Sequence, residues 1–260
     1  MVLQIFFVMK QGDREKIRYT EIDVIRGLAV LGMVGFHAAF IAQFFFGIIL
    51  CPGSFFWEAI PTLGNIFFIL VGLSLYIGAS QGKYPSLLPV IQKSGLLLVA
   101  GLLITCTTYL ADFGEKIYFG VLHCLGLSTL ISFPLLLLPK YLILVSSILI
   151  ITLGMYYRYI PHPYCTPSLC WLYPCFCPTL DPMLDYYPLI PSLGFMLIGT
   201  FLGKQYYPQG RRTVTQARLA SHVFSVRGLA LIGRHSLLIY LLHAPIIYAL
   251  LYLMSQVRLF

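Results

Sequence analysis

Residues 23–44 read DVIRGLAVLGMVGFHAAFIAQF, a run in which the only formal charges are Asp23 and Arg26 near its start. A helix of about 20 apolar residues spans the ~30 Å hydrocarbon core of a membrane. An apolar run of this length, with no polar stripe along it, favours a transmembrane helix over the half-buried helix of a soluble protein.

Six further apolar runs of similar length follow along the chain. They lie at residues 60–80, 94–112, 117–138, 140–159, 187–206 and 229–254. The chain of 260 residues is 59% hydrophobic and 10% charged, whereas a soluble domain carries about 25% charge. The sequence therefore predicts an all-α, polytopic membrane helical bundle of about seven transmembrane helices, formed as a single domain over residues 1–260.

The basic residues predict the orientation, because Lys and Arg are concentrated in cytoplasmic loops. With the N-terminus in the cytoplasm, the cytoplasmic segments carry Lys10, Arg14, Lys16, Arg18, Lys83, Lys93, Lys140, Lys204, Arg211, Arg212, Arg218 and Arg227, and the external segments carry Lys116, Arg158 and Arg258. This asymmetry predicts a cytoplasmic N-terminal segment 1–20 and a basic cytoplasmic loop 207–228 in a cell-membrane protein. Topology and attraction to anionic lipids then account for the formal net charge of +8 without a nucleic-acid partner.

The predicted external loop 160–185 is rich in cysteine and proline. Its cysteines are Cys165, Cys170, Cys175 and Cys177. Four cysteines in an external loop favour two disulfides, for which three pairings exist. Free thiols and a metal site remain as alternatives, although the spacing C-x4-C-x4-C-x-C differs from the paired C-x2-C motifs of common zinc sites.

Ionisable side chains inside the apolar runs are candidate functional residues. Such groups are costly in hydrocarbon and usually face a protein interior or a water-filled cavity. They are Arg26, His37, His123, Arg234, His235 and His243, with Asp185 at the external start of the 187–206 run. His37 follows Arg26 by eleven residues, close to three helical turns and about 16 Å of rise, so the two side chains are expected on one face.

Depth sorts these residues into two levels. A cytoplasmic, cationic level contains Arg26, Arg234 and His235, and a level above it contains His37, His123, His243 and Asp185. Arginine binds phosphate through bidentate hydrogen bonds, and neutral imidazole is suited to act as a general base. This pattern predicts a reaction that takes an anionic donor from the cytoplasm and delivers a group to an external acceptor.

Other interpretations of the same residues stay open. A single membrane histidine often serves only as an interhelical hydrogen-bonding group, and arginine near a membrane boundary extends to lipid headgroups. A small-solute or proton-coupled membrane transporter would also use intramembrane His and Arg. A non-catalytic membrane scaffold would tolerate substitution of Arg26 and His37.

Four sequence blocks, in order, resemble the heparan-alpha-glucosaminide N-acetyltransferase catalytic-domain family. They are RYTEIDVIRGLA at 18–29 with the following Phe36-His37, YFGVLHCLG at 118–126, DYYPLIP at 185–191 and GRHSLLIYLLHAP at 233–245. The spacing of Arg26 and His37 also resembles a motif of the bacterial O-antigen acyltransferase family. The blocks span nearly the whole chain and are most similar to a short prokaryotic-type member.

The resemblance implies transfer of an acetyl group from cytoplasmic acetyl-CoA to an amino or hydroxyl group of a sugar or glycan beyond the membrane. It implies catalytic roles for His37, His123, Asp185 and His243, and donor binding by Arg26, Arg234, His235 and Ser236, without a metal. Of the histidines, His37 is the predicted general base. The expected partners are membrane lipids, acetyl-CoA and the glycan acceptor, with a homodimer as a further expectation.

Overall fold

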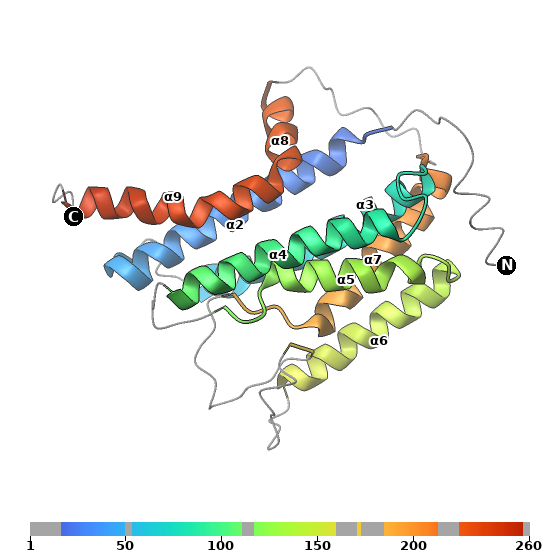
Figure 1. Ribbon diagram of the computed structural model, residues 1–260, viewed down its shortest axis with the longest axis horizontal. Coiled ribbons are helices and arrows are strands. Elements are labelled where there is room, and N and C mark those ends of the chain that lie inside the picture. The colour runs from blue at the N-terminus through green and yellow to red at the C-terminus, as the bar shows by residue number, and fades with distance from the viewer. Residues whose placement is uncertain are drawn as a thin grey trace. The chain divides into compact units, whose positions relative to one another are not determined.

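The computed structural model describes residues 17–49, 54–110, 117–159, 171–172, 185–212 and 224–256. Within these ranges the regular structure is helical, and the all-α prediction is confirmed for them (Figure 1). The α-helices are α2 (Thr20–Phe46), α3 (Ser54–Ser80), α4 (Leu88–Leu110), α5 (Val121–Leu135), α6 (Lys140–Tyr159), α7 (Leu189–Tyr206), α8 (Phe224–Arg234) and α9 (Ser236–Gln256), and a short 3-10 turn, η2, covers Pro208–Gly210.

Four of the described helices have the length and apolar composition to cross a membrane. They are α2, α4, α9 and the Lys140–Tyr157 part of α6. The described stretches Gly64–Ser80 and Val121–Leu135 are shorter apolar helices. Each of the first six predicted runs overlaps one helix, whereas the count of seven spans and the cytoplasmic N-terminus stay predictions.

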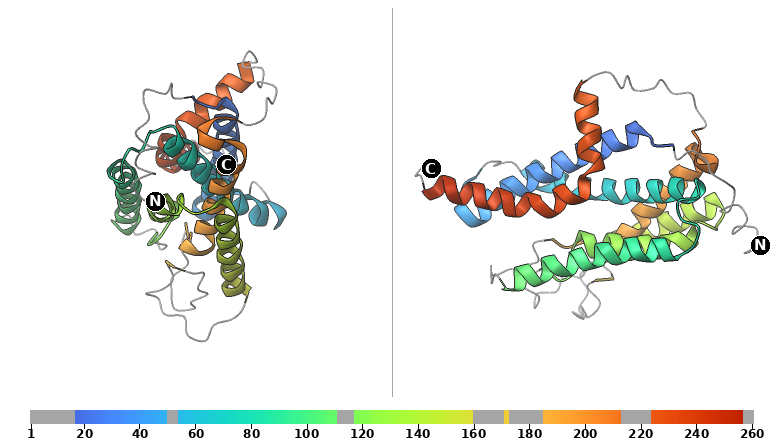
Figure 2. Two further views of the ribbon diagram at one scale, coloured as in Figure 1. Left: turned by 90° about the vertical axis from the view of Figure 1, so that its right-hand side faces the viewer. Right: turned by 45° about the horizontal axis from the view of Figure 1, so that its top comes forward.

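The seventh predicted run, 229–254, differs from the single helix expected there. The structure divides it at His235, where α8 ends and α9 begins. The His235 N–H is shared between the carbonyl oxygens of Leu231 and Ile232, at 3.2 and 3.1 Å, a bifurcated pattern common at helix ends. In Figure 1 and in the right-hand view of Figure 2, α8 turns steeply away from α9.

A pair of glycines explains why α8 leaves the line of α9. A Cβ added at Gly27 of α2 would collide with the backbone carbonyl of Leu229, and one added at Gly233 of α8 would collide with that of Asp23. Small residues at a helix crossing let two backbones come into contact. The packing of α8 on α2 therefore sets its direction, and apolar composition alone does not reveal this.

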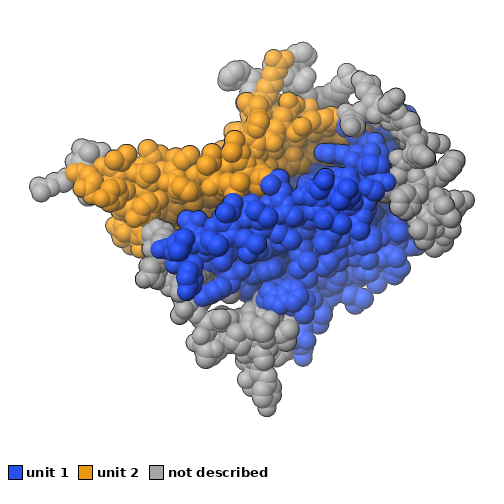
Figure 3. Space-filling view, viewed as in Figure 1, with its two compact units in different colours: residues 1–17, 68–214 blue, residues 18–67, 215–260 orange. Residues whose placement is uncertain are grey.

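The chain divides into two compact units, residues 1–17 with 68–214 and residues 18–67 with 215–260 (Figure 3). In the first unit α5 packs against α4 and α7, and α6 packs against α7; Figures 1 and 2 both show α4 and α5 side by side. In the second unit α2 packs against α8 and α9. The single-domain prediction, which concerns the whole chain, stays a prediction.

Several sequence predictions fall on residues that the structure leaves undescribed. Of the loop 160–185, only residues 171–172 and 185 are described. The four loop cysteines, Cys165, Cys170, Cys175 and Cys177, therefore lie outside the described residues, and so do most of the N-terminal segment 1–20 and the middle of the 207–228 loop.

Candidate functional site

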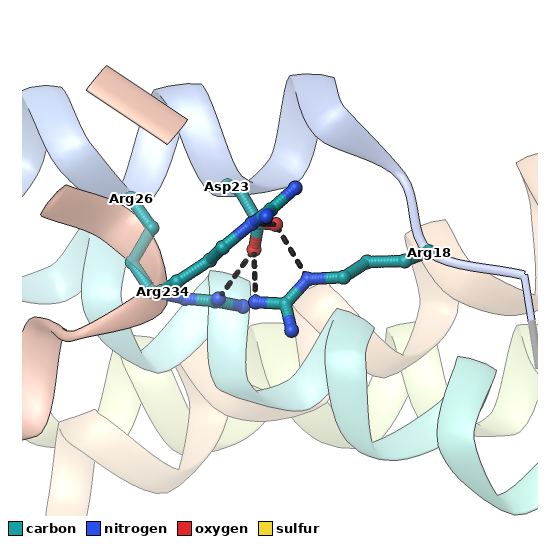
Figure 4. Close-up of polar contacts among 4 residues, drawn as sticks. All are labelled: Arg18, Asp23, Arg26 and Arg234. Atoms are coloured by element: carbon teal, nitrogen blue, oxygen red, sulfur yellow. Dashed lines mark hydrogen bonds and ion pairs between the residues drawn. The ribbon is translucent and has the colours of Figure 1, made fainter. Parts of the chain in front are cut away.

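A buried carboxylate, Asp23, gathers three arginines at the start of α2 (Figure 4). Its Oδ2 accepts a hydrogen bond from Nε of Arg18 at 2.7 Å, and its Oδ1 accepts one from Nη1 of Arg26 at 3.0 Å. From α8, Nε of Arg234 lies 3.3 Å from Oδ2. We call Arg18, Asp23, Arg26 and Arg234 the arginine–aspartate cluster.

The arginine–aspartate cluster carries more positive charge than its carboxylate can balance. Asp23 keeps 4% of its side chain exposed and Arg26 keeps 18%, whereas Arg18 and Arg234 are about half exposed, at 57% and 46%. Each guanidinium has five N–H donors, so three of them exceed what two carboxylate oxygens accept. The hydrogen bond to Asp23 raises the pKa of Arg18, so its charge is retained. The cluster is therefore suited to bind an additional anionic group, such as a phosphate.

Arg26 and Arg234 were predicted as site residues, whereas Asp23 was not. Arg18 was predicted only as a cytoplasmic charge. One signal was available, because Asp23 lies three residues before Arg26 in an otherwise apolar helix and residues at that spacing are neighbours on a helix surface. The contribution of Arg234, from α8, requires the fold.

Two of the predicted histidines face each other in the second unit. The rings of His37 on α2 and His243 on α9 have centroids 4.8 Å apart and planes at 71°. Nδ1 of His37 lies 2.9 Å from the Met33 carbonyl oxygen, and Nδ1 of His243 lies 2.6 Å from the Tyr240 carbonyl oxygen. A carbonyl only accepts hydrogen bonds, so both Nδ1 atoms carry the hydrogen. In each neutral ring Nε2 then holds the lone pair that a general base needs. We call these two residues the histidine pair.

His123 and Asp185 belong to the first unit, at the start of α5. Oδ2 of Asp185 accepts a hydrogen bond from the Val121 N–H at 3.0 Å, so this carboxylate caps the positive end of the helix. His123 is 7% exposed. A Cβ added at Gly101 of α4 would lie 2.8 Å from the imidazole Nδ1, so the ring packs directly on the α4 backbone.

The other two predicted donor-binding residues lie at the junction of α8 and α9. His235 is exposed between the two helices, and Ser236 begins α9. Both follow Arg234 directly in the chain, which connects them to the arginine–aspartate cluster. The residues that the structure describes contain no group of three or more His, Cys, Asp or Glu side chains able to hold a metal ion.

These features define a helical protein with membrane-spanning candidates, an arginine–aspartate cluster and two histidines that face each other on one helix pair. Comparison with protein families gives a match over residues 18–245 to the catalytic domain described as heparan-alpha-glucosaminide N-acetyltransferase. The chain belongs to this family, and the resemblance found in its sequence is confirmed. Membership indicates a membrane acetyltransferase and gives no support to the transporter alternative.

The matched range includes every residue that the sequence predicted for the site, from Arg26 to His243. Searches of curated proteins and of solved structures found no match to the chain.

Proposed function

We propose that the protein is a multi-pass cell-membrane acetyltransferase that moves an acetyl group from cytoplasmic acetyl-CoA to an amino or hydroxyl group of a sugar or glycan on the far side. The family match over residues 18–245 is the observation that carries this proposal. The apolar helices α2, α4, α6 and α9 support the membrane location. A homodimer stays a prediction.

The arginine–aspartate cluster is the proposed binding site for the phosphates of acetyl-CoA. Phosphate groups require cationic, multidentate partners when they leave water. Asp23 acts as a positioning residue, because one buried carboxylate fixes the side chains of Arg26 and Arg234 from two different helices. His235 and Ser236 adjoin Arg234 and are proposed to add hydrogen bonds to the donor.

The histidine pair is the proposed catalytic base. Nε2 of His37 removes a proton from the acceptor amine or hydroxyl as that nitrogen or oxygen attacks the thioester carbonyl carbon. The C–S bond then breaks, and the sulfur leaves and takes up the proton from the imidazolium. The products are an amide or ester and CoA with a free thiol, and His37 is neutral again.

His243 has a supporting role in this proposal. Two imidazolium ions at a ring separation of 4.8 Å would repel each other. Protonation of both rings at once is therefore unfavourable. His243 is therefore proposed to stay neutral while His37 carries the proton of the acceptor. His123 is proposed as an alternative or partner base, and Asp185 as an orienting or acceptor-binding carboxylate.

Replacing Arg26 with alanine is expected to weaken acetyl-CoA binding by about 1.5–3 kcal/mol, the range for hydrogen bonds to charged groups. This corresponds to roughly a 10- to 150-fold higher Kd. The measurement is thermal stabilisation of the purified protein by acetyl-CoA, with ATP and free CoA for comparison. Arg227→Ala, which removes an exposed arginine of α8, is the control and should bind normally. An unchanged affinity in folded Arg26→Ala would leave Arg26 as a lipid anchor.

A further inference from the structure

The two rings of the histidine pair are held in the way that is usual for metal-binding histidines. Nδ1 of His37 donates to the Met33 carbonyl at 2.9 Å, and Nδ1 of His243 donates to the Tyr240 carbonyl at 2.6 Å. A histidine that ligates a metal through one ring nitrogen almost always donates the other N–H to a carbonyl or carboxylate, which fixes its tautomer and orientation. Both rings meet this requirement, and the Nε2 lone pair of each neutral ring is available to a metal ion.

The separation of the two rings fits one shared ion. An imidazole nitrogen binds Zn²⁺ at about 2.0–2.1 Å, which places the ion about 3.2 Å from the ring centroid. Two rings with centroids 4.8 Å apart then subtend about 100° at the ion, between the ~90° of square-planar and the ~109° of tetrahedral coordination. His37 and His243 lie on α2 and α9, which pack against each other within one compact unit. The pair can therefore supply two ligands to a single ion.

The described part of the chain gives this ion two protein ligands. The rings next to the histidines are aromatic, Phe36 beside His37 and Tyr240 beside His243, at centroid distances of 5.5 and 5.6 Å. The described residues offer no third His, Cys, Asp or Glu to this pair, whereas resident zinc sites have three or four protein ligands. His37 is half-buried, so water can occupy the remaining coordination positions. The pair is therefore suited to reversible binding of an ion and not to a resident cofactor.

Two imidazoles select the kind of ion. Imidazole suits Zn²⁺, Cu²⁺ and Ni²⁺, whereas Mg²⁺ and Ca²⁺ prefer oxygen ligands. We propose that the histidine pair is an inhibitory site for such a transition-metal ion, which binds Nε2 of both His37 and His243. While the ion is bound, the lone pair of His37 cannot take the proton of the acceptor, and transfer stops until the ion dissociates. The inhibition rests on the proposed acetyltransferase function, but binding of the ion does not.

The first measurement is Zn²⁺ binding to the purified protein, by isothermal titration calorimetry after chelation has removed other metals. Wild-type protein should bind one more equivalent than His243→Ala, because a single imidazole remains in that variant. Zn²⁺ held elsewhere in the chain contributes equally to both proteins and cancels in the difference. His235→Ala is the matched control, since it removes an exposed histidine outside the pair, and it should bind as wild type does. Equal binding by wild type and folded His243→Ala would refute the site. His243→Gln, which is closer in size to histidine, provides the same comparison if His243→Ala does not fold.

The second measurement is inhibition of acetyl transfer by Zn²⁺. Saturating Zn²⁺ should abolish transfer by the wild-type protein, and EDTA should restore it. The residual transfer of His243→Ala should need a Zn²⁺ concentration higher by about 10-fold or more for half-inhibition, since even loss of a supporting partner weakens metal binding this much. Full transfer at saturating Zn²⁺ would refute the inhibitory role. Absence of transfer by metal-free wild-type protein would overturn the acetyltransferase proposal, and the difference in Zn²⁺ binding would still support the metal site.

Discussion

Replacing His37 with alanine is expected to lower the rate of acetyl transfer by about 10²- to 10⁴-fold, the usual contribution of a general base, and to leave acetyl-CoA binding intact. The reason is geometric, because the Met33 carbonyl holds the hydrogen on Nδ1 of His37 and leaves the Nε2 lone pair for the acceptor proton. The measurement is kcat for glucosamine acetylation together with thermal stabilisation by acetyl-CoA.

Two further variants serve as comparisons for the turnover of His37→Ala. Gln43→Ala removes an exposed polar side chain from the same helix and should keep normal turnover. His243→Ala removes the second ring of the histidine pair, and a smaller loss than that of His37→Ala is expected. Near-normal turnover in His37→Ala would indicate that His243 or His123 is the general base. The role of α2 would then be limited to donor binding.

Replacing Asp23 with asparagine is expected to destabilise the protein by roughly 1.5–3 kcal/mol, because the arginines lose their charged hydrogen-bond acceptor. Most of this loss should come from Arg26, the least exposed of the three, since exposed ion pairs contribute little. The measurement is the free energy of unfolding in detergent. Glu21→Gln removes the other carboxylate of the first turn of α2, one that is less deeply buried, and should cost less.

Equal destabilisation by the Asp23 and Glu21 variants would contradict this prediction. If Asp23→Asn and Glu21→Gln destabilise the protein equally, the arginine–aspartate cluster contributes no more than an ordinary surface charge. Its proposed role in orienting Arg26 and Arg234 would then be lost. Arg26→Ala combined with Asp23→Asn should destabilise by less than the sum of the two single changes, because the two residues share one interaction.

The helices could be predicted from the sequence because their signal is local. Apolar composition and length identify a run such as 23–44 as helical, and α2 (Thr20–Phe46) extends only slightly beyond it. The break at His235 could not be predicted in this way. It depends on the contact of Gly233 with the backbone of Asp23, and these residues are far apart in the sequence.

Some features of the candidate site could likewise be predicted from local sequence, whereas others depend on the fold. Depth along α2 and α9 placed His37 and His243 at a common level, and the structure brings their rings together. The pairing of Arg234 with Asp23 joins positions 211 residues apart, and no periodicity encodes it. Asp185 was expected at the external start of the 187–206 run. Its carboxylate caps α5 through Val121, 64 residues away, which only the packing of the first unit establishes.

Acetyl transfer from acetyl-CoA is tested most directly by product analysis with purified protein in reconstituted vesicles. Acetyl-CoA labelled with carbon-13 in the acetyl group is incubated with the protein and glucosamine, and the products are measured by mass spectrometry. We expect labelled N-acetylglucosamine and an equal amount of free CoA, with little of either from His37→Ala. A wild-type protein that is folded but consumes no acetyl-CoA and forms no labelled sugar would contradict it.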